Sequence, residues 1–265
     1  MAVLADLKGK NAVVLGASAQ GGTGFAIARA LAQAGASVTI AARSIDKLEP
    51  LAAAIGARWI ACDAGDETQV RALAAFAASD APIDIAVNSA ALPVIGGIAD
   101  IAFADVEQAM KVNYYGMLHF LRECTERMAD NGSVVLISSY SAVQPIHPHF
   151  AYACAKAATD CLVRYAALAY GSRGIRVNSI QPGPIKSDLA KDLCAIPGVE
   201  EVFAREVPLG RIGVPDDYAN AVLWLASGAF VTGLNIPVNG GNQLTRMPRA
   251  DELPMGEASY EGDYN

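Results

Sequence analysis

The chain has 265 residues, of which 53% are hydrophobic and 18% are charged, and its formal net charge is −7. An acidic chain without a basic stripe does not suit a nucleic-acid partner, because phosphate binding requires clustered Lys and Arg. No apolar run reaches the roughly 18 residues that a membrane span requires, and the opening MAVLADLKGK lacks the pattern of a signal peptide. We therefore expect a cytoplasmic protein that binds neither nucleic acid nor membrane.

Short apolar segments alternate with longer alanine-rich segments along the chain. This alternation predicts a parallel sheet with right-handed crossovers, hence an α/β fold: a single doubly wound Rossmann domain with about seven strands and helices on both faces. A length of this order suits one domain, which we expect to span residues 1–244. Strands are predicted at 12–15, 37–41, 57–61, 83–87, 133–137, 176–180 and 234–238. Helices are predicted at 24–33, 45–55, 67–77, 105–129, 151–170 and 215–226.

The first predicted strand runs into LGASAQGGTGFAIARALAQAGA, in which a strand, a glycine cluster and a helix follow one another. Glycine lets the backbone approach a pyrophosphate, and the free N–H groups at a helix start face the anion. Gly16, Gly22 and Gly24 are the candidates for this role. An ordinary strand–helix turn that contains glycine is the alternative at this point.

The end of the second predicted strand bears on the choice of cofactor. Nucleotide folds that prefer NAD place an acid here to bind the ribose 2′-OH, whereas this chain has Ala42, Arg43 and Ser44. Arg43 can bind a 2′-phosphate through two hydrogen bonds, with Ser18 or Ser44 assisting. NADP(H) is therefore expected over NAD(H), with a surface arginine at a helix start as the alternative. Asp63, after the third strand, is placed to bind the adenine amino group or to cap the next helix.

Three side chains carry the strongest indication of chemistry. Tyr152 and Lys156 are four residues apart and share one face of a helix whose other residues are mostly small and apolar. A lysine without a purpose would be costly to bury there. Its ammonium and an oxidised nicotinamide would both favour the phenolate, so Tyr152 can act as a general acid or base near neutral pH. Ser139, at the end of a strand, could hold the substrate oxygen beside it. A solvent-facing pair on an amphipathic helix is the alternative.

Nearly the whole chain, up to about Gln243, resembles the short-chain dehydrogenases/reductases. The matching segments are GASAQGGTG, VNSA at 87–90, KVNYYG around Asn113, and ISS before YACAK. NSIQPGPIKSDLA at 178–190, PLGRIGVPDDYANAVLWLAS and TGLNIPVNGG complete the set. The spacing of Ser139, Tyr152 and Lys156, together with Pro182-Gly183, is highly specific.

The resemblance implies a role for each matching residue. Tyr152 would be the acid–base group, Lys156 would lower its pKa and bind the nicotinamide ribose, and Ser139 would orient the carbonyl. Asn113 would hold a water in a proton relay through Lys156. Hydride transfer itself would belong to the cofactor. The remaining cofactor contacts would be Asn88 and Ala90 after the fourth strand, Pro182, Gly183 and Ile185 beside the nicotinamide, and Ser187 near its carboxamide.

Three departures from the family pattern stand out. The first two glycines are usually four apart, but Gly16 and Gly22 are six apart, so two extra residues must bulge within 17–21. The family's Asn-Asn-Ala-Gly appears as NSAA at 88–91, and Asn239 replaces the usual aspartate near the end. None of these changes removes a catalytic group.

The substrate is expected to lie against loops at the carboxyl ends of the strands, at 94–98, 144–150 and 184–207. These loops are mainly apolar, with His147 and His149 as exceptions that we interpret as solvated rather than metal-binding. A medium-sized apolar or cyclic ketone or secondary alcohol is therefore favoured. One alternative is a 3-oxoacyl-thioester reductase of the same chemistry. Another, of a different class, is a non-catalytic dinucleotide-sensing regulator, against which the intact Ser–Tyr–Lys set argues.

The predicted helices at 105–129 and 151–170 are apolar around much of their circumference, which predicts a homo-oligomer because such helices are normally buried. The resemblance suggests that they pair about a two-fold axis in a homotetramer, with Ala153, Ala157 and Ala158 allowing close approach.

The end of the chain, 245–265, combines five acids and two prolines with scattered apolar residues such as Met247 and Leu253. We expect it to be a C-terminal tail that forms a subunit contact or covers the active site, with a passive solvated extension as the alternative.

The cysteines form no recognisable framework. There are five, with no CxxC pair and no metal-ligand spacing. We expect reduced core residues and no bound metal. They are Cys62, Cys124, Cys154, Cys161 and Cys194.

Overall fold

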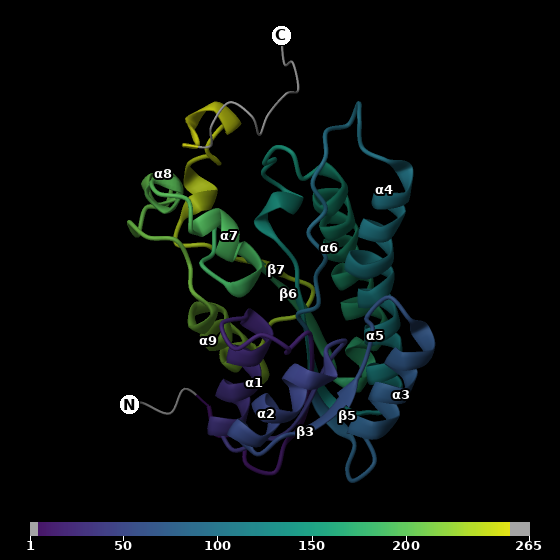
Figure 1. Cartoon of the computed structure of the whole chain (residues 1–265). Coiled ribbons are helices and arrows are strands. Elements are labelled where there is room, and N and C mark those ends of the chain that lie inside the picture. Colours follow the sequence, from purple (N-terminus) through teal and green to yellow (C-terminus); the bar gives the residue numbers. More distant parts are fainter. Residues whose placement is uncertain (1–4, 255–265) are drawn as a thin grey trace.

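A parallel sheet of seven strands, in the order β3-β2-β1-β4-β5-β6-β7, forms the centre of the computed structural model, which describes residues 5–254 (Figure 1). The strands are β1 (Asn11–Leu15), β2 (Ser37–Ala42), β3 (Arg58–Ala61), β4 (Ile83–Asn88), β5 (Met128–Ile137), β6 (Arg176–Pro182) and β7 (Asn235–Val238). The α-helices are α1 (Thr23–Gln33), α2 (Ile45–Ile55), α3 (Glu67–Ala77), α4 (Phe103–Met110), α5 (Gly116–Glu126), α6 (Phe150–Tyr170), α7 (Lys191–Cys194), α8 (Val199–Arg205) and α9 (Pro215–Ala226).

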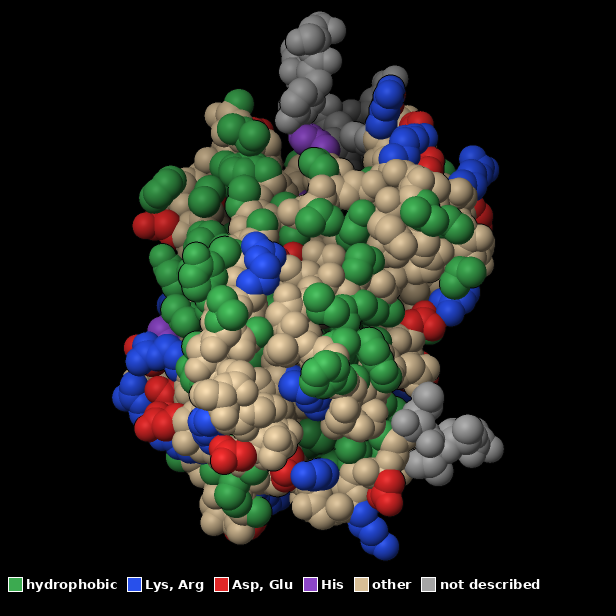
Figure 2. Space-filling view, turned by 180° about the vertical axis from the view of Figure 1, so that it is seen from behind, with side chains coloured by type: hydrophobic (Ala, Val, Ile, Leu, Met, Phe, Trp, Pro, Cys, Tyr) green, Lys and Arg blue, Asp and Glu red, His purple; other side chains and the backbone are tan. Residues whose placement is uncertain are grey.

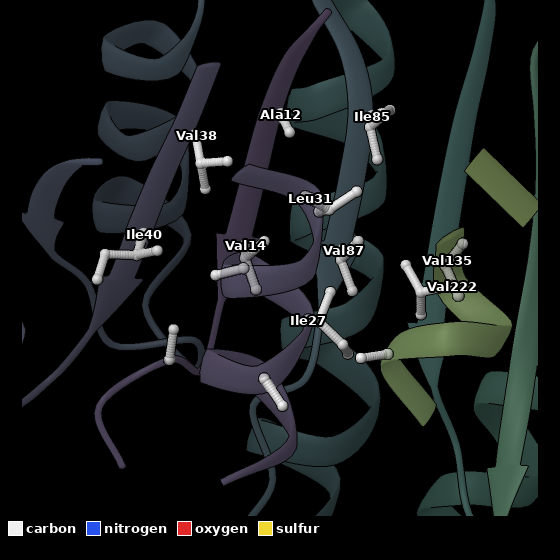
Figure 3. Packing of buried hydrophobic residues seen from close by; sticks show 14 of the residues in the cluster. Ala12, Val14, Ile27, Leu31, Val38, Ile40, Ile85, Val87, Val135 and Val222 are labelled. Atoms are coloured by element: carbon white, nitrogen blue, oxygen red, sulfur yellow. The ribbon is translucent and has the colours of Figure 1, made fainter. Parts of the chain in front are cut away.

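The central strands β1 and β4 carry runs of apolar residues without alternation because helices cover both faces of the sheet. In β1, Val14 packs in the core under α1 and α9, whereas Val13 and Leu15 face the core under α3, α5 and α6. Figure 3 shows the first of these cores, with Ile27 of α1 and Val222 of α9 lying over the strands. The predicted doubly wound fold and its seven strands are confirmed.

The order of the strands fixes where a ligand can bind. The chain leaves β1 toward β2 and β3 and then crosses back to β4 on the other side of β1. The connections after β1 and β4 therefore run in opposite directions and leave a crevice at the carboxyl edge of the sheet, where such folds bind ligands. Gly16 follows β1, Ser89 follows β4, and Ser139 lies just beyond β5.

The long helix predicted at 105–129 is not continuous. A π-helical turn, Lys111–Tyr115, separates α4 from α5, and α5 ends at Glu126. Met128 already belongs to β5, because it is buried in the core and pairs with Ile83. The short helices α7 and α8, within the loop predicted at 184–207, were also not anticipated.

The prediction of core cysteines is only partly right. All five cysteines are free; Cys62 and Cys124 are buried, but Cys154 and Cys161 are exposed on α6. Both point away from the sheet because α6 buries only the opposite face, which carries Ala155. Across the described part of the chain, no helix is long and apolar enough to cross a membrane.

Candidate active site

Two adjoining cavities open at the carboxyl edge of the sheet. One, of about 470 Å³, lies between the first glycine-rich turn and the ends of β2, β4 and β5, and we call it the glycine-turn cavity. The other, of about 640 Å³, lies beside α7 and α8, and we call it the apolar cavity. The residues that line both cavities are Ser139, Tyr152, Pro182, Gly183, Ile185 and Ser187.

The glycine-turn cavity depends on two glycines that allow backbone segments to touch. Gly16 has φ of 96°, and an added Cβ there would lie 2.6 Å from the carbonyl carbon of Ser89. At Gly24, an added Cβ would lie 2.8 Å from the carbonyl carbon of Gly16. Gly22 is the N-cap of α1, whose first turn contains no acid and lines the cavity. The arrangement suits a diphosphate, because free backbone N–H groups and a helix N-terminus face it.

The two extra residues of the glycine-rich turn carry it across to the segment after β6. The backbone N–H of Gly21 donates to Oδ2 of Asp188 at 2.9 Å, and the N–H of Asp188 donates to the carbonyl of Gly21 at 3.3 Å. An added Cβ on Gly21 would lie 2.8 Å from Asp188 Oδ1. Asp188 also lines the glycine-turn cavity, a position that sequence reasoning missed.

At the end of β2, Ala42 is buried and Arg43 is exposed, and both line the glycine-turn cavity with Ser44. Lys47, in the first turn of α2, lines it as well. Its position one helical turn after Arg43 could have revealed it, since residues four apart near a helix start share a face.

Asp63 lines the cavity, and its Oδ1 accepts from the N–H of Gly65 at 2.8 Å. The suggestion that it caps the next helix is wrong. The N-cap of α3 is Asp66, whose side chain accepts from the N–H groups of Thr68 and Gln69.

Ser139, Tyr152 and Lys156 come together where the cavities join. Burial raises the pKa of Tyr152 to about 12, and a hydrogen bond with the Ser139 side chain opposes this shift. Lys156 Nζ lies 5.5 Å from the centre of the Tyr152 ring and donates to the carbonyl of Ile137 at 2.8 Å. Burial lowers the pKa of Lys156 to about 7, against the charge of Asp160. The three groups can therefore place a proton donor and a cation beside a substrate oxygen.

Asn113 lies in the π-helical turn and does not line either cavity. Its Oδ1 accepts from the N–H of Leu92 at 3.0 Å, and its Nδ2 donates to the carbonyls of Leu92 at 2.9 Å and Ala109 at 3.0 Å. Its own backbone carbonyl accepts from Thr159 Oγ1 at 2.8 Å. The amide thus holds the segment after β4, so a water in the expected relay would have to use the second lone pair of the backbone carbonyl.

Asn88 is likewise fully buried beneath the cavity floor. Its Oδ1 accepts from the N–H of Ala90 at 2.9 Å, and its Nδ2 donates to the carbonyl of Gly116 at 3.3 Å. It fixes Ala90 in place instead of lining the cavity. The predicted residues that do line the glycine-turn cavity are Gly16, Ser18, Gly22, Gly24, Arg43, Ser44, Asp63, Ala90, Ser139, Tyr152, Lys156, Pro182, Gly183, Ile185 and Ser187.

The other two departures from the family pattern lie near the same site. Ala91, where the family has glycine, lines the glycine-turn cavity. Asn239 is buried behind Gly183, and an added Cβ on Gly183 would lie 2.7 Å from the Asn239 Cβ. Its Oδ1 accepts from the N–H of Gly241 at 3.2 Å, so the amide stabilises a turn next to the cavity.

The apolar cavity is lined by parts of all three predicted loops. Ile95 comes from the first of these loops, His147 and His149 from the second, and Ile196 and Phe203 from the third. Burial lowers the pKa of His149, which favours its neutral form; the expectation of two solvated histidines is therefore wrong for His149. Among the described residues that line this cavity there is no Lys or Arg.

The described part of the tail closes one side of the apolar cavity. Met247 and Leu253, two of the apolar residues noted in the tail, line it. Gln144 Nε2 donates to the carbonyl of Thr245 at 3.1 Å. Arg246 forms ion pairs with Glu206 at 2.9 Å and with Glu252 at 2.6 Å. The rest of the tail, 255–265, lies outside the described residues.

Comparison with known proteins points to one family. The family model described as enoyl-(acyl carrier protein) reductase matches residues 16–243. The 7α-hydroxysteroid dehydrogenase of Escherichia coli K12 is 36% identical over 252 residues, covering 89% of this chain and 94% of that protein. The D-threitol dehydrogenase of Mycolicibacterium smegmatis is 32% identical over 245 residues, with coverage of 89% and 93%. The structure of a short-chain type dehydrogenase/reductase from Mycobacterium ulcerans superposes with a TM-score of 0.88 at 30% identity, covering 92% of this chain and 93% of that one.

Proposed function

Since the chain belongs to the short-chain dehydrogenase/reductase family of oxidoreductases, which use nicotinamide dinucleotides, we propose that it is an NADP(H)-dependent enzyme that interconverts a ketone and a secondary alcohol. The observation that carries the proposal is the meeting of Ser139, Tyr152 and Lys156 at the junction of the two cavities.

The glycine-turn cavity fits a dinucleotide. Gly16 and Gly24 let the backbone segments around the cavity approach closely, because a Cβ at either position would meet backbone atoms within 2.8 Å, and the acid-free start of α1 lines the cavity. The cofactor would supply the hydride. The expected contacts are the glycine-turn residues, Ser18, Asp63 and Ala90 on one side, and Pro182, Gly183, Ile185 and Ser187 on the other.

The protein's own groups would handle the proton. In reduction, Ser139 would hold the carbonyl oxygen while the Tyr152 phenol donates a proton to it. In oxidation, the Tyr152 phenolate would accept the proton of the alcohol. The Ser139 hydrogen bond opposes the effect of burial on the pKa of Tyr152, and the charge of a Lys156 ammonium would favour the phenolate further. Asn113 would act through its backbone carbonyl, as the end of a relay through Lys156.

Preference for NADP(H) is supported by two cations. Arg43 and Lys47 both line the glycine-turn cavity at the end of β2, where the chain has no acid to bind a ribose 2′-OH. A 2′-phosphate there would be met by a planar guanidinium and an ammonium.

The substrate cavity favours a medium-sized apolar or cyclic molecule. Its walls include Ile95, Ile146, Ile196, Phe203 and Met247. A steroid-sized ring system suits these walls better than a polyol, so the hydroxysteroid dehydrogenase is the more informative of the two relatives described above. The lack of Lys and Arg among the described lining residues argues against a carrier-bound 3-oxoacyl chain.

We propose further that the enzyme is a cytoplasmic homotetramer, in keeping with its free cysteines. On α6, Tyr165 and Leu168 are 71% and 84% exposed, and Phe103 at the start of α4 is 75% exposed. In Figure 2, hydrophobic side chains also gather at several places on the rear face. Burying such surface against other copies removes it from water.

Turnover with a panel of ketones tests the proposed function. We expect NADPH oxidation with a steroid-sized cyclic ketone, slower oxidation of NADH, and little activity toward a 3-oxoacyl thioester. Nucleotide binding without turnover of any ketone or alcohol would instead support a non-catalytic dinucleotide sensor.

A further inference from the structure

A buried carboxylate lies one helical turn beyond Lys156 on α6. Asp160 is 5% exposed and Lys156 is 1% exposed. The proposed proton chemistry makes no use of Asp160. An isolated buried carboxylate is costly unless hydrogen bonds and an opposite charge compensate it, so its presence requires an account.

Side chains from two neighbouring strands surround the Asp160 carboxylate. Gln181 Nε2 donates to its Oδ2 at 2.6 Å, and Ser179 Oγ, which has one proton, lies 3.1 Å from its Oδ1 and 2.8 Å from Asn235 Oδ1. The Ser138 side chain also hydrogen bonds to it. Burial raises the pKa of Asp160, and these hydrogen bonds oppose that shift because an ionised carboxylate can only accept.

Most of the described side chains that face Asp160 are uncharged. The residues that face it are Ser138 beyond β5, Ser179 and Gln181 on β6, and Asn235 on β7, whose Nδ2 donates to the Asp160 backbone carbonyl at 3.2 Å. All of these are neutral. Within the described residues, Lys156 is the charged group that acts on Asp160, and Asp160 is the charge that opposes the effect of burial on Lys156.

We propose that Asp160 is a positioning residue whose carboxylate supplies the counter-charge that keeps the buried Lys156 ammonium ionised beside Tyr152. The proposal rests on the acid–base roles proposed above. Burial alone favours a neutral lysine, and a neutral lysine would no longer favour the tyrosine phenolate. The Ser138, Ser179 and Gln181 side chains would hold the carboxylate in the ionised form.

The pH dependence of ketone reduction tests this role. The reactive form holds the Tyr152 phenol and the Lys156 ammonium, so kcat/KM falls as the pH rises and either group loses its proton. Removal of a nearby negative charge makes both groups release their protons at lower pH. In Asp160→Asn, which keeps the size of the side chain, we expect the alkaline limb of kcat/KM to move to lower pH by about one unit.

Ser179→Ala is the matched control, because it removes one hydrogen-bonding partner while Ser138 and Gln181 remain to hold the carboxylate in its ionised form. Its alkaline limb should stay close to that of the unmodified enzyme. A uniform loss of activity in Asp160→Asn, with the limb unmoved, would show that Asp160 is only structural and would overturn the proposal.

A stability cycle tests the charge interaction between Asp160 and Lys156, which are not in direct hydrogen-bond contact. It needs no turnover, and so separates this proposal from failure of the proposed function. The free energy of unfolding is measured for the unmodified protein, Asp160→Asn, Lys156→Met and the double variant. We expect Asp160→Asn to be destabilising when Lys156 is present, and neutral or stabilising in the Lys156→Met background, where the carboxylate lacks its partner. Equal changes in unfolding free energy in the two backgrounds would refute the charge interaction between Asp160 and Lys156. If Asp160→Asn does not fold, a double variant less stable than Lys156→Met gives the same refutation.

Discussion

The contact between the start of α1 and the end of β1 gives the sharpest prediction about the glycine-rich turn. Gly24→Ala would place a Cβ 2.8 Å from the carbonyl carbon of Gly16 and 3.3 Å from the Cα of Ala17. Carbon atoms in ordinary contact are about 3.5–4.0 Å apart, and both neighbours are backbone atoms that cannot rotate away. The helix must therefore shift by about half an ångström or more, although α1 is packed against the sheet and α9.

Overpacking of this kind costs about 1–3 kcal/mol of unfolding free energy. For a chain of this size, each kcal/mol corresponds to roughly 2–4 °C, so Tm should fall by roughly 2–12 °C. The affinity for NADPH, measured by titration, should also fall, because the glycine-rich turn that lines the glycine-turn cavity is displaced. Gly171→Ala is the control: Gly171 has φ of −59°, nothing lies within 4 Å of an added Cβ, and the change should leave Tm unchanged or raise it slightly. A Gly24→Ala protein with unchanged Tm and NADPH affinity would refute the argument from close backbone approach.

Three further predictions concern the cofactor, the tail and the assembly. Arg43→Asp should raise KM for NADPH and improve the use of NADH, because it replaces the cation expected at the 2′-phosphate with an acid; equal use of both cofactors by the unmodified enzyme would contradict this. Truncation before Thr245 removes Met247 and Leu253 from the wall of the apolar cavity, so KM for an apolar ketone should rise several-fold. A shortened protein with unchanged kinetics, Tm and oligomeric state would mean that the tail is passive. Light scattering at micromolar concentration should give the mass of a tetramer, whereas a monomer mass would exclude the proposed assembly.

The features that sequence predicts well are local. Tyr152 and Lys156 share a face because they are four apart on α6, and the glycines of the first turn follow a strand directly. Each of these inferences needs only the geometry of one element or one connection. The parallel sheet with helices on both faces likewise follows from alternating strands and helices with right-handed crossovers.

The features that sequence did not predict depend on contacts between distant segments. Gly21 meets Asp188, 167 positions later, because the lengthened turn reaches across the cavity. For the tail, the sequence left a subunit contact, an active-site cover and a passive extension open, and only the path of the chain places Met247 and Leu253 at the apolar cavity. The π-helical turn at Asn113 carries no periodicity of its own, since five residues cannot establish one. Asn88 matched a family position, but its burial was visible only in the folded chain.

The central claim is that Tyr152 transfers the proton of a carbonyl reduction, and one comparison tests it most directly. The unmodified enzyme and Tyr152→Phe are assayed with saturating NADPH and a cyclic ketone, and NADPH binding is measured by titration for both. Because Tyr152→Phe removes only the phenolic hydroxyl, we expect binding to be retained while turnover falls by about 10²–10⁴-fold or more. A Tyr152→Phe enzyme that binds NADPH and keeps most of its turnover would contradict the claim and assign the proton transfer to another group.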